Sequence, residues 1–426
     1  MADILKPDLC IIGGGSGGLT VAASARAFGA SVVLIEKGEM GGDCLNFGCV
    51  PSKSLIAAAR HAEAGRSGKA FGVGFSAPKV DFARVNAHIQ GVIADIAPHD
   101  SVERFEALGV TVIKDHARFT DKRTVIAGDT TIRARRFVVA TGARAAIPPI
   151  PGLDAVPYLT NETVFNLTSR PKHLVVVGAG PIGTELAQAY RRLGSGVTVV
   201  EMADALARED PEMAEIVLRR VKADGVDVRA RTAIVSVARR DDAIVVTIKP
   251  ENGAEEEITG SHLLIAAGRA PNVEDMGLDQ ARIKTGKTGI KVNSRLRTSN
   301  RRVYAIGDVA GRLHFTHVAG YHGALVVRST LFGLPAPVKP TIIPWATYTD
   351  PEIAHVGLTE AEASKRFGAS FKVLEFLAVA EGGSPLFSMT TLLATTGLFG
   401  LVTVLSACYP ALQGARVEPS AALVAI

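Results

Sequence analysis

Several residue types are scarce in this 426-residue chain, and each scarcity excludes a class of protein. Four cysteines in so long a chain do not form the framework of a disulfide-rich secreted domain. Aromatic residues make up 5%, the net charge is only +5, and no basic run interleaved with aromatics stands out, which argues against nucleic-acid binding. The first residues show no signal-peptide pattern, so we expect a cytoplasmic protein.

The remaining composition is that of a globular chain with a large core. Hydrophobic residues make up 47% and charged residues 21%, and 43 glycines supply many tight turns. The length predicts two or three domains. Together these features favour an α/β protein with nucleotide-binding loops.

A glycine motif lies between two strand-like segments near the N-terminus. Such glycines allow a tight turn and the close approach of a pyrophosphate, and the acid after the second strand accepts hydrogen bonds from ribose hydroxyls. This arrangement predicts a first dinucleotide site. Its parts are the strand Leu9–Ile12, the glycines Gly13, Gly15 and Gly18, the helix Leu19–Phe28, the strand Ser31–Ile35 and Glu36.

The same pattern occurs a second time, with 23 positions from the first glycine to the acid in both copies. Two complete units are more specific than one, so we expect two bound dinucleotides. The acid of the second copy suits a free 2′-hydroxyl and favours NAD over NADP, although Arg191, Arg192 and Arg208 are near enough in sequence to weaken that preference. Its parts are Leu174–Val177, Gly178, Gly180, Gly183, Thr184–Leu193, Val197–Val200 and Glu201.

Other segments give a coarser outline. Residues Val80–Leu108 predict a long helix, and the Pro-rich stretch Ile147–Leu153 predicts a domain boundary. Two later strands end in Gly268 and in Gly307-Asp308. A strand that ends in Gly-Asp places an acid at a strand's carboxyl end, although a simple turn is the alternative.

The segment Gly41–Lys53 carries two cysteines, Cys44 and Cys49, with four residues between them, and Lys53 follows the second by four positions. A helix that begins at this point and a nearby lysine both stabilise a thiolate, the species that attacks disulfides. The spacing also allows a reversible disulfide. A zinc site is the alternative, but no second Cys or His pair lies nearby, so we expect no metal.

These motifs resemble those of the pyridine nucleotide–disulfide oxidoreductases, flavoproteins that include dihydrolipoamide dehydrogenase, glutathione reductase and mercuric reductase. The resemblance spans about residues 8 to 367. The matching stretches are IIGGGSGG, GGDCLNFGCVPSK, ATGA, VVGAGPIGTELA, AAGRAPN, YAIGDVAG, HFTHVAGYHG and YTDPEIAHVGLT.

The resemblance implies FAD on the first unit and NAD(H) on the second. Cys44 matches the thiol that exchanges with substrate, Cys49 the thiol beside the flavin, Lys53 the lysine near flavin N5, and Glu185 its carboxylate partner. Further FAD contacts are implied for Ala117, Thr141, Gly142, Asp308, Thr316 and His317.

We therefore expect two Rossmann-like dinucleotide-binding domains and an α+β C-terminal interface domain that is truncated or altered. The expected limits are 1–148 for the first part of the FAD-binding domain, 149–270 for the NAD-binding domain, 271–338 for the second FAD part and 339–426 for the incomplete dimerisation domain with an apolar tail.

The family pattern stops after about Leu374. The family's C-terminal acid–base histidine has no counterpart, because the last histidine is His355, and residues Gly382–Ala415 contain no charged side chain. Residues 386–405 are long and apolar enough to suggest a membrane anchor, whereas the abrupt loss of pattern favours a degenerate or frame-shifted tail. Either way we expect flavin reduction to be retained and substrate turnover to be impaired.

The leading hypothesis is a dihydrolipoamide dehydrogenase-like enzyme that moves electrons between NAD(H), FAD and the Cys44–Cys49 pair, acting on a small or protein-bound disulfide as a homodimer. A mercuric reductase is the second, but the vicinal cysteines expected near its C-terminus are represented only by Cys408. A catalytically impaired flavoprotein with a membrane-associated tail and a thiol-independent NADH oxidase are the remaining alternatives.

Overall fold

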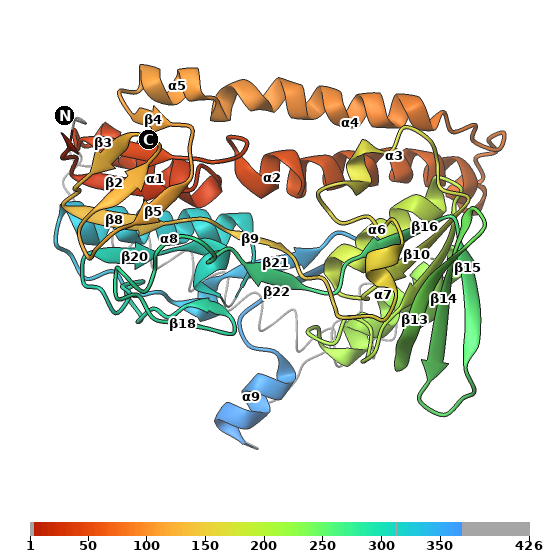
Figure 1. Cartoon of the computed structure of the whole chain (residues 1–426). Helices are drawn as coiled ribbons and strands as arrows, with labels where there is room; N and C mark the ends of the chain where they lie inside the picture. The colour runs from red at the N-terminus through yellow and green to blue at the C-terminus, as the bar shows by residue number, and fades with distance from the viewer. Residues whose placement is uncertain (1–3, 312, 369–426) are drawn as a thin grey trace, which may run out of the picture. The chain divides into compact units, whose positions relative to one another are not determined.

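The computed structural model describes residues 4–311 and 313–368 (Figure 1). Its contacts divide the chain into two units, Met1–Glu362 and Ala363–Ile426, and the first unit contains every site discussed below. The expected degenerate or membrane-anchoring tail lies outside the described residues. Within residues 4–311 and 313–368, no helix is both long and apolar enough to cross a membrane.

A five-stranded parallel sheet carries the first glycine motif, in the order β20-β8-β2-β3-β4. The central strand β2 is buried along its whole length, because its alternate side chains enter two different cores. Leu9 and Ile11 pack with helices α1 and α8, whereas Cys10 and Ile12 pack with the small sheet that contains β5. The bounds are β2 (Leu9–Ile12), α1 (Ser16–Ala27), β3 (Val32–Ile35), β4 (Thr111–Ile113), β5 (Ala117–Phe119), β8 (Arg136–Val139), β20 (Val303–Ala305) and α8 (Thr316–Leu331).

A second parallel sheet, in the order β12-β11-β10-β16, carries the second glycine motif. Strands β10, β11 and β16 are Val- or Leu-rich and mostly buried, as expected for a parallel sheet covered on both faces, whereas the edge strand β12 is not buried. The two parallel sheets, each with a glycine turn and a following helix, confirm the expected α/β fold with Rossmann-like units. The bounds are β10 (His173–Val177), α6 (Pro181–Arg192), β11 (Gly196–Val200), α7 (Pro211–Ala223), β12 (Asp227–Arg229) and β16 (His262–Ile265).

Antiparallel sheets and one mixed sheet, in which β1 pairs in parallel with β7, complete the first unit and were not predicted as such. In the sheet β13-β14-β15, a register irregularity between Ile234 and Ser236 interrupts the alternation that would have marked a strand. The other sheets are β1-β7-β6-β5 and the pairs β17-β9, β18-β19 and β21-β22. Their bounds are β1 (Ile4–Leu5), β6 (Val125–Ala127), β7 (Thr130–Ile132), β9 (Ala143–Ala145), β13 (Thr232–Arg240), β14 (Ala243–Pro250), β15 (Glu256–Gly260), β17 (Arg269–Pro271), β18 (Thr285–Gly286), β19 (Gly289–Ile290), β21 (Pro344–Thr347) and β22 (Ile353–Val356).

The long helix expected over 80–108 is wrong, because it is divided into two. Asp81 caps α4 (Phe82–Ile96), a 3₁₀ turn that contains Pro98 follows, and Ser101 caps α5 (Val102–Ala107) by accepting a hydrogen bond from the Arg104 amide. Helix α4 packs against α3 (Cys49–Ser67), and the two run alongside each other in Figure 1. The remaining helices are α2 (Gly42–Asn46) and α9 (Glu360–Phe367).

Candidate active site

The segment Gly41–Lys53 lies directly against the first glycine turn. The Gly41 amide donates to the Gly14 carbonyl at 2.9 Å, and Gly41 and Gly42 both adopt positive φ, at +83° and +60°. A Cβ on Gly42 would lie only 2.7 Å from Gly15 Cα. Glycine is thus required here for the close approach. The segment then enters α2, which carries Cys44, and α3, whose first residue is Cys49.

Cys44 and Cys49 are both free thiols, and their environments separate their acidities. The hydrogen bond from Cys44 is the main cause that lowers the pKa of Cys49 to about 6; Thr316 and Lys53 act in the same direction, against burial and Asp43. Thr316 Oγ1 lies 3.1 Å from Cys49 Sγ. The same hydrogen bond and burial raise the pKa of Cys44. The shared hydrogen bond therefore favours the thiolate on Cys49 and the proton on Cys44.

Lys53 and Glu185 form the ion pair that the resemblance implies, with Nζ 2.7 Å from Oε2. The second carboxylate oxygen of Glu185 accepts the Tyr348 amide at 2.8 Å, and the Tyr348 ring centroid lies 4.3 Å from Lys53 Nζ. The Glu185 side chain is only 7% exposed, so these contacts hold a buried charge. Tyr348 was not predicted as a site residue; its place at the start of the family-matching stretch YTDPEIAHVGLT is the one sequence signal that could have singled it out.

The first glycine turn has the shape of a dinucleotide cradle. A Cβ on Gly18 would lie 1.9 Å from the Gly13 carbonyl oxygen, whereas a Cβ on Gly15 would meet no atom closer than 3.8 Å. The turn is therefore tight on its inner side and open where a pyrophosphate would approach. Glu36 is held beside the turn, because its carboxylate accepts the Gly14 amide at 2.5 Å and the Gly38 amide at 2.6 Å.

Three of the remaining predicted FAD contacts follow the carboxyl ends of strands of the first parallel sheet, whereas Ala117 begins a strand and His317 lies in a helix. Thr141 and Gly142 follow β8, Ala117 begins β5, and Asp308 follows β20 in a 3₁₀ turn. His317 lies beside Thr316 in the first turn of α8, where its Nε2 donates to the Pro344 carbonyl at 2.7 Å.

Arg269 and Asp43 also belong to this group and were not predicted from the sequence as site residues. Arg269 lies 3.2 Å from Asp43 and 3.3 Å from Asp308, and burial raises the pKa of Asp43. Arg269 Nε is buried and makes no hydrogen bond among the described residues. This donor lies 3.3 Å from Asp308 Oδ2 without a hydrogen bond to it, which leaves the bond for a polar ligand group, so the residues present suit the cofactor that the motif implies.

The second glycine turn repeats the cradle. A Cβ on Gly183 would lie 2.0 Å from the Gly178 carbonyl oxygen, whereas Gly180 faces space with no atom within 4 Å. Glu201 accepts the Ala179 amide at 2.8 Å and the Ala203 amide at 3.0 Å. Gly268, with φ of +121°, follows the neighbouring strand β16 by three residues.

The arginines near Glu201 in sequence are occupied elsewhere. Arg191 donates to the Asp224 and Ser195 carbonyls, and Arg192 pairs with the Asp224 carboxylate. Neither is therefore available to bind a 2′-phosphate. Two of the three arginines that could weaken the preference for NAD are thus bound to other residues. No three His, Cys, Asp or Glu side chains of the described residues are grouped to hold a metal ion.

Comparison with known proteins gives the same picture. The family model for pyridine nucleotide-disulphide oxidoreductases matches residues 7–323. The chain is 36% identical over 365 residues to the mercuric reductase of Streptomyces lividans, and the match covers 84% of this chain and 77% of that protein. It is 34% identical over 373 residues to dihydrolipoyl dehydrogenase 3 of Haloarcula marismortui, again covering 84% and 77%. Other mercuric reductases are longer, and the chain spans 66% of two of them.

A solved structure is also similar. The Cu(II) complex of the HOCl-induced flavoprotein disulfide reductase RclA from Escherichia coli superposes with a TM-score of 0.74 at 27% identity, over 84% of this chain and 79% of that one. The family match covers well over half of the chain and includes both glycine turns and the cysteine segment. The chain therefore belongs to the pyridine nucleotide-disulphide oxidoreductase family, whose members use FAD together with NAD(P).

Proposed function

We propose that this flavoprotein oxidoreductase uses Cys44 and Cys49 as its redox pair. The single observation that carries the proposal is the environment of Cys49, which lies at the first position of α3 with Cys44, Thr316 and Lys53 all lowering its pKa. A cysteine with a structural role needs none of these features. Cys10, by contrast, is fully buried in β2, and burial raises its pKa.

The cofactor contacts are part of the same proposal. The turn Gly13, Gly15 and Gly18, with Glu36, would hold FAD, and the turn Gly178, Gly180 and Gly183, with Glu201 and Gly268, would hold NAD(H). Bound FAD supplies hydride acceptance from the nicotinamide and electron transfer to a disulfide. Around it we assign binding contacts to Lys53, Ala117, Thr141, Gly142, Asp308, Thr316 and His317.

The two cysteines divide the thiol chemistry between them. When the Cys44 sulfur, once deprotonated, attacks a substrate disulfide, one substrate thiolate leaves and a mixed disulfide forms on Cys44. The Cys49 thiolate then attacks the Cys44 sulfur, closing the Cys44–Cys49 disulfide and releasing the second substrate thiolate. Both leaving thiolates take up a proton. The raised pKa of Cys44 makes removal of its proton the demanding step.

For the substrate we propose the lipoamide disulfide and its dithiol, dihydrolipoamide, first: the steps above reduce the disulfide, and the same steps in reverse oxidise the dithiol. Mercuric ion is the second candidate, favoured by the names of similar relatives such as the Streptomyces lividans mercuric reductase. NAD(H) is preferred to NADP(H), because the Glu201 carboxylate repels a 2′-phosphate and Arg191 and Arg192 are bound elsewhere. The expected loss of turnover depends on residues outside the described part of the chain and stays a prediction.

The larger organisation is proposed on the same basis. Members of the family are typically homodimers, and we propose that this chain is a cytoplasmic homodimer with an FAD-binding domain made of 1–148 and 271–338 and an NAD-binding domain at 149–270. Light scattering of the purified protein would measure the mass, and a monomeric mass would contradict the dimer.

The test of the proposed function compares wild type with Cys44→Ser and Cys49→Ser. We expect wild type to oxidise NADH faster than NADPH, with reduced but measurable turnover of lipoamide or Hg(II), and both variants to lose this remaining substrate-dependent oxidation of NADH. Assays with lipoamide and with Hg(II) side by side decide between the two substrates. Undiminished oxidation of NADH with either substrate in both variants would refute the role of the cysteine pair and favour a thiol-independent oxidase.

A further inference from the structure

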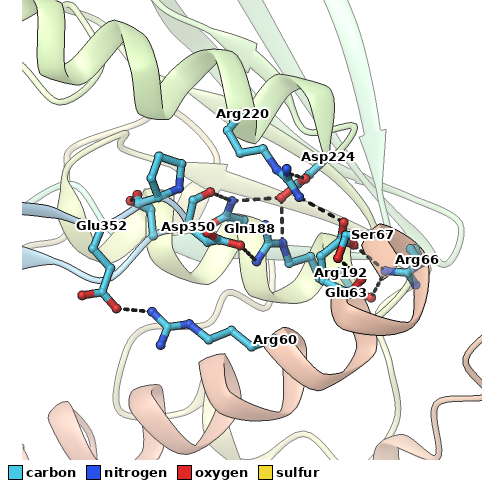
Figure 2. Close-up of polar contacts among 12 residues, drawn as sticks. Arg60, Glu63, Arg66, Ser67, Gln188, Arg192, Arg220, Asp224, Asp350 and Glu352 are labelled. Atoms are coloured by element: carbon cyan, nitrogen blue, oxygen red, sulfur yellow. Dashed lines mark hydrogen bonds and ion pairs between the residues drawn. The ribbon is translucent and has the colours of Figure 1, made fainter. Parts of the chain in front are cut away.

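A cluster of charged side chains joins the redox helix α3 to the second nucleotide-binding unit (Figure 2). Arg192 and Asp224 are 3% and 4% exposed, with Nε 2.7 Å from Oδ2. Arg220 donates to the other oxygen of Asp224 at 2.9 Å and reaches Glu63 of α3 at 3.1 Å. Buried ion pairs are often no more stabilising than apolar residues of similar volume, so stability alone is a weak explanation for this cluster.

The cluster clamps one residue of the connection between β21 and β22. Arg192 Nη1 lies 2.8 Å from the Asp350 carboxylate. The Gln188 side chain accepts the Asp350 amide at 2.8 Å and donates to the Asp350 carbonyl at 2.9 Å. Glu185, Gln188 and Arg192 are spaced i, i+3, i+7 along α6 and so share one face of the helix. Asp350 is therefore fixed to the face of α6 that also presents Glu185.

Fixing Asp350 also fixes Tyr348, two residues earlier. The Tyr348 amide occupies one oxygen of Glu185 while Lys53 occupies the other. The Tyr348 ring lies over the Lys53 ammonium. Movement of this segment would therefore remove one contact from each partner of the Lys53–Glu185 pair at once.

We propose that Arg192 and Gln188 are positioning residues for the redox centre: by clamping Asp350 they hold Tyr348 on the Lys53–Glu185 pair and keep the Lys53 charge beside Cys49. The inference rests on the proposed function of that pair and extends it. Lys53 attracts the Cys49 thiolate whereas Asp43 opposes it, so displacement of Lys53 leaves the thiolate less stabilised.

Three variants remove the clamp in different ways. Gln188→Leu removes the hydrogen bonds to the Asp350 main chain without leaving a charge unpaired on α6. Arg192→Lys keeps the positive charge but loses the planar guanidinium that contacts both the Asp224 and the Asp350 carboxylate. Asp350→Asn is the mildest, because the Asp350 side chain is half-exposed and its main-chain contacts with Gln188 remain. Arg60→Gln is the matched control: it removes an ion pair between α3 and Glu352, next to the same segment but on the surface.

Each variant is purified with its cofactor, reduced with dithiothreitol, and alkylated with iodoacetamide across pH 5 to 9. We expect the midpoint for Cys49 to rise by about half a pH unit in Gln188→Leu and Arg192→Lys, which is about threefold slower alkylation below the midpoint. A smaller rise is expected in Asp350→Asn and none in Arg60→Gln. Hydrogen exchange of the Tyr348 amide should be at least about tenfold faster in the first two variants.

The outcomes separate the two proposals. Folded variants, by melting temperature, with an unchanged Cys49 midpoint would show that the cluster is only structural, and an equal shift in Arg60→Gln would also overturn the inference. If Gln188→Leu and Arg192→Lys do not fold, Asp350→Asn decides. Because the cysteines are reduced chemically, failure of wild type to be reduced by NADH would refute the proposed function and leave this test intact.

Discussion

Removal of the Cys44 thiol is expected to raise the pKa of Cys49. The hydrogen bond from Cys44 is the largest of the effects that bring the Cys49 pKa from 9.0 to about 6. With a pKa near 6, Cys49 is about 90% thiolate at pH 7; a thiol at its ordinary value would be about 1% thiolate. Cys44→Ala removes the main cause, so most of this roughly hundredfold difference should be lost. The thiolate would then form only as the pH approaches 9.

The assay is the pH dependence of iodoacetamide alkylation of Cys49 in the reduced protein, followed by mass spectrometry. Wild type should show a midpoint near pH 6, and Cys44→Ala a midpoint two or more units higher. Cys44→Ser is the matched control, because its hydroxyl still donates a hydrogen bond and should preserve part of the shift. Equal midpoints in wild type and Cys44→Ala would refute the reasoning, as would a wild-type midpoint near 9.

Three other predictions concern the nucleotide cradles and the ion pair. Glu201→Gln should reduce the preference for NADH over NADPH by about tenfold or more in kcat/KM, because a carboxylate no longer faces the 2′ position; an unchanged ratio would contradict this. Gly180→Ala should weaken NADH binding and leave the melting temperature unchanged. Gly183→Ala should weaken NADH binding and also lower the melting temperature, because the added Cβ would lie 2.0 Å from the Gly178 carbonyl oxygen. Equal melting temperatures of the two variants would contradict the geometry. Lys53→Met leaves Glu185 buried without its cation and should cost about 1–3 kcal/mol in urea unfolding, reduced from the fully buried case because Lys53 is 38% exposed; no loss would show that the pair is already screened.

The two parallel sheets and their glycine turns were predictable because their causes are local. A buried apolar strand, a turn that only glycine permits and a following helix are all encoded within about 25 residues, and Gly13 and Gly178 indeed take φ of +111° and +106°. The failure over 80–108 was also local in origin. Its apolar periodicity outweighed Pro98 and the capping residue Ser101, which together end one helix and begin another.

The assembled site was less predictable, because its partners are distant in sequence. Lys53 and Glu185 are 132 positions apart, and their pairing followed from the family resemblance rather than from spacing. Tyr348 and Arg269 were given no role, although both lie in stretches that match the family, YTDPEIAHVGLT and AAGRAPN, because nothing in those stretches indicates which distant residues they contact. Only the packing of α3, α6 and the β21–β22 connection reveals that Tyr348 contacts Glu185 and Lys53.

The central claim is that electrons from a nicotinamide reach the Cys44–Cys49 pair. The most direct measurement is anaerobic titration of the oxidised protein with NADH, followed by alkylation and counting of the newly exposed thiols on each cysteine. We predict that one equivalent of label appears on Cys44 and one on Cys49 as NADH is consumed, with Cys10 unlabelled because it is fully buried. Consumption of NADH with neither cysteine becoming reduced would contradict the account.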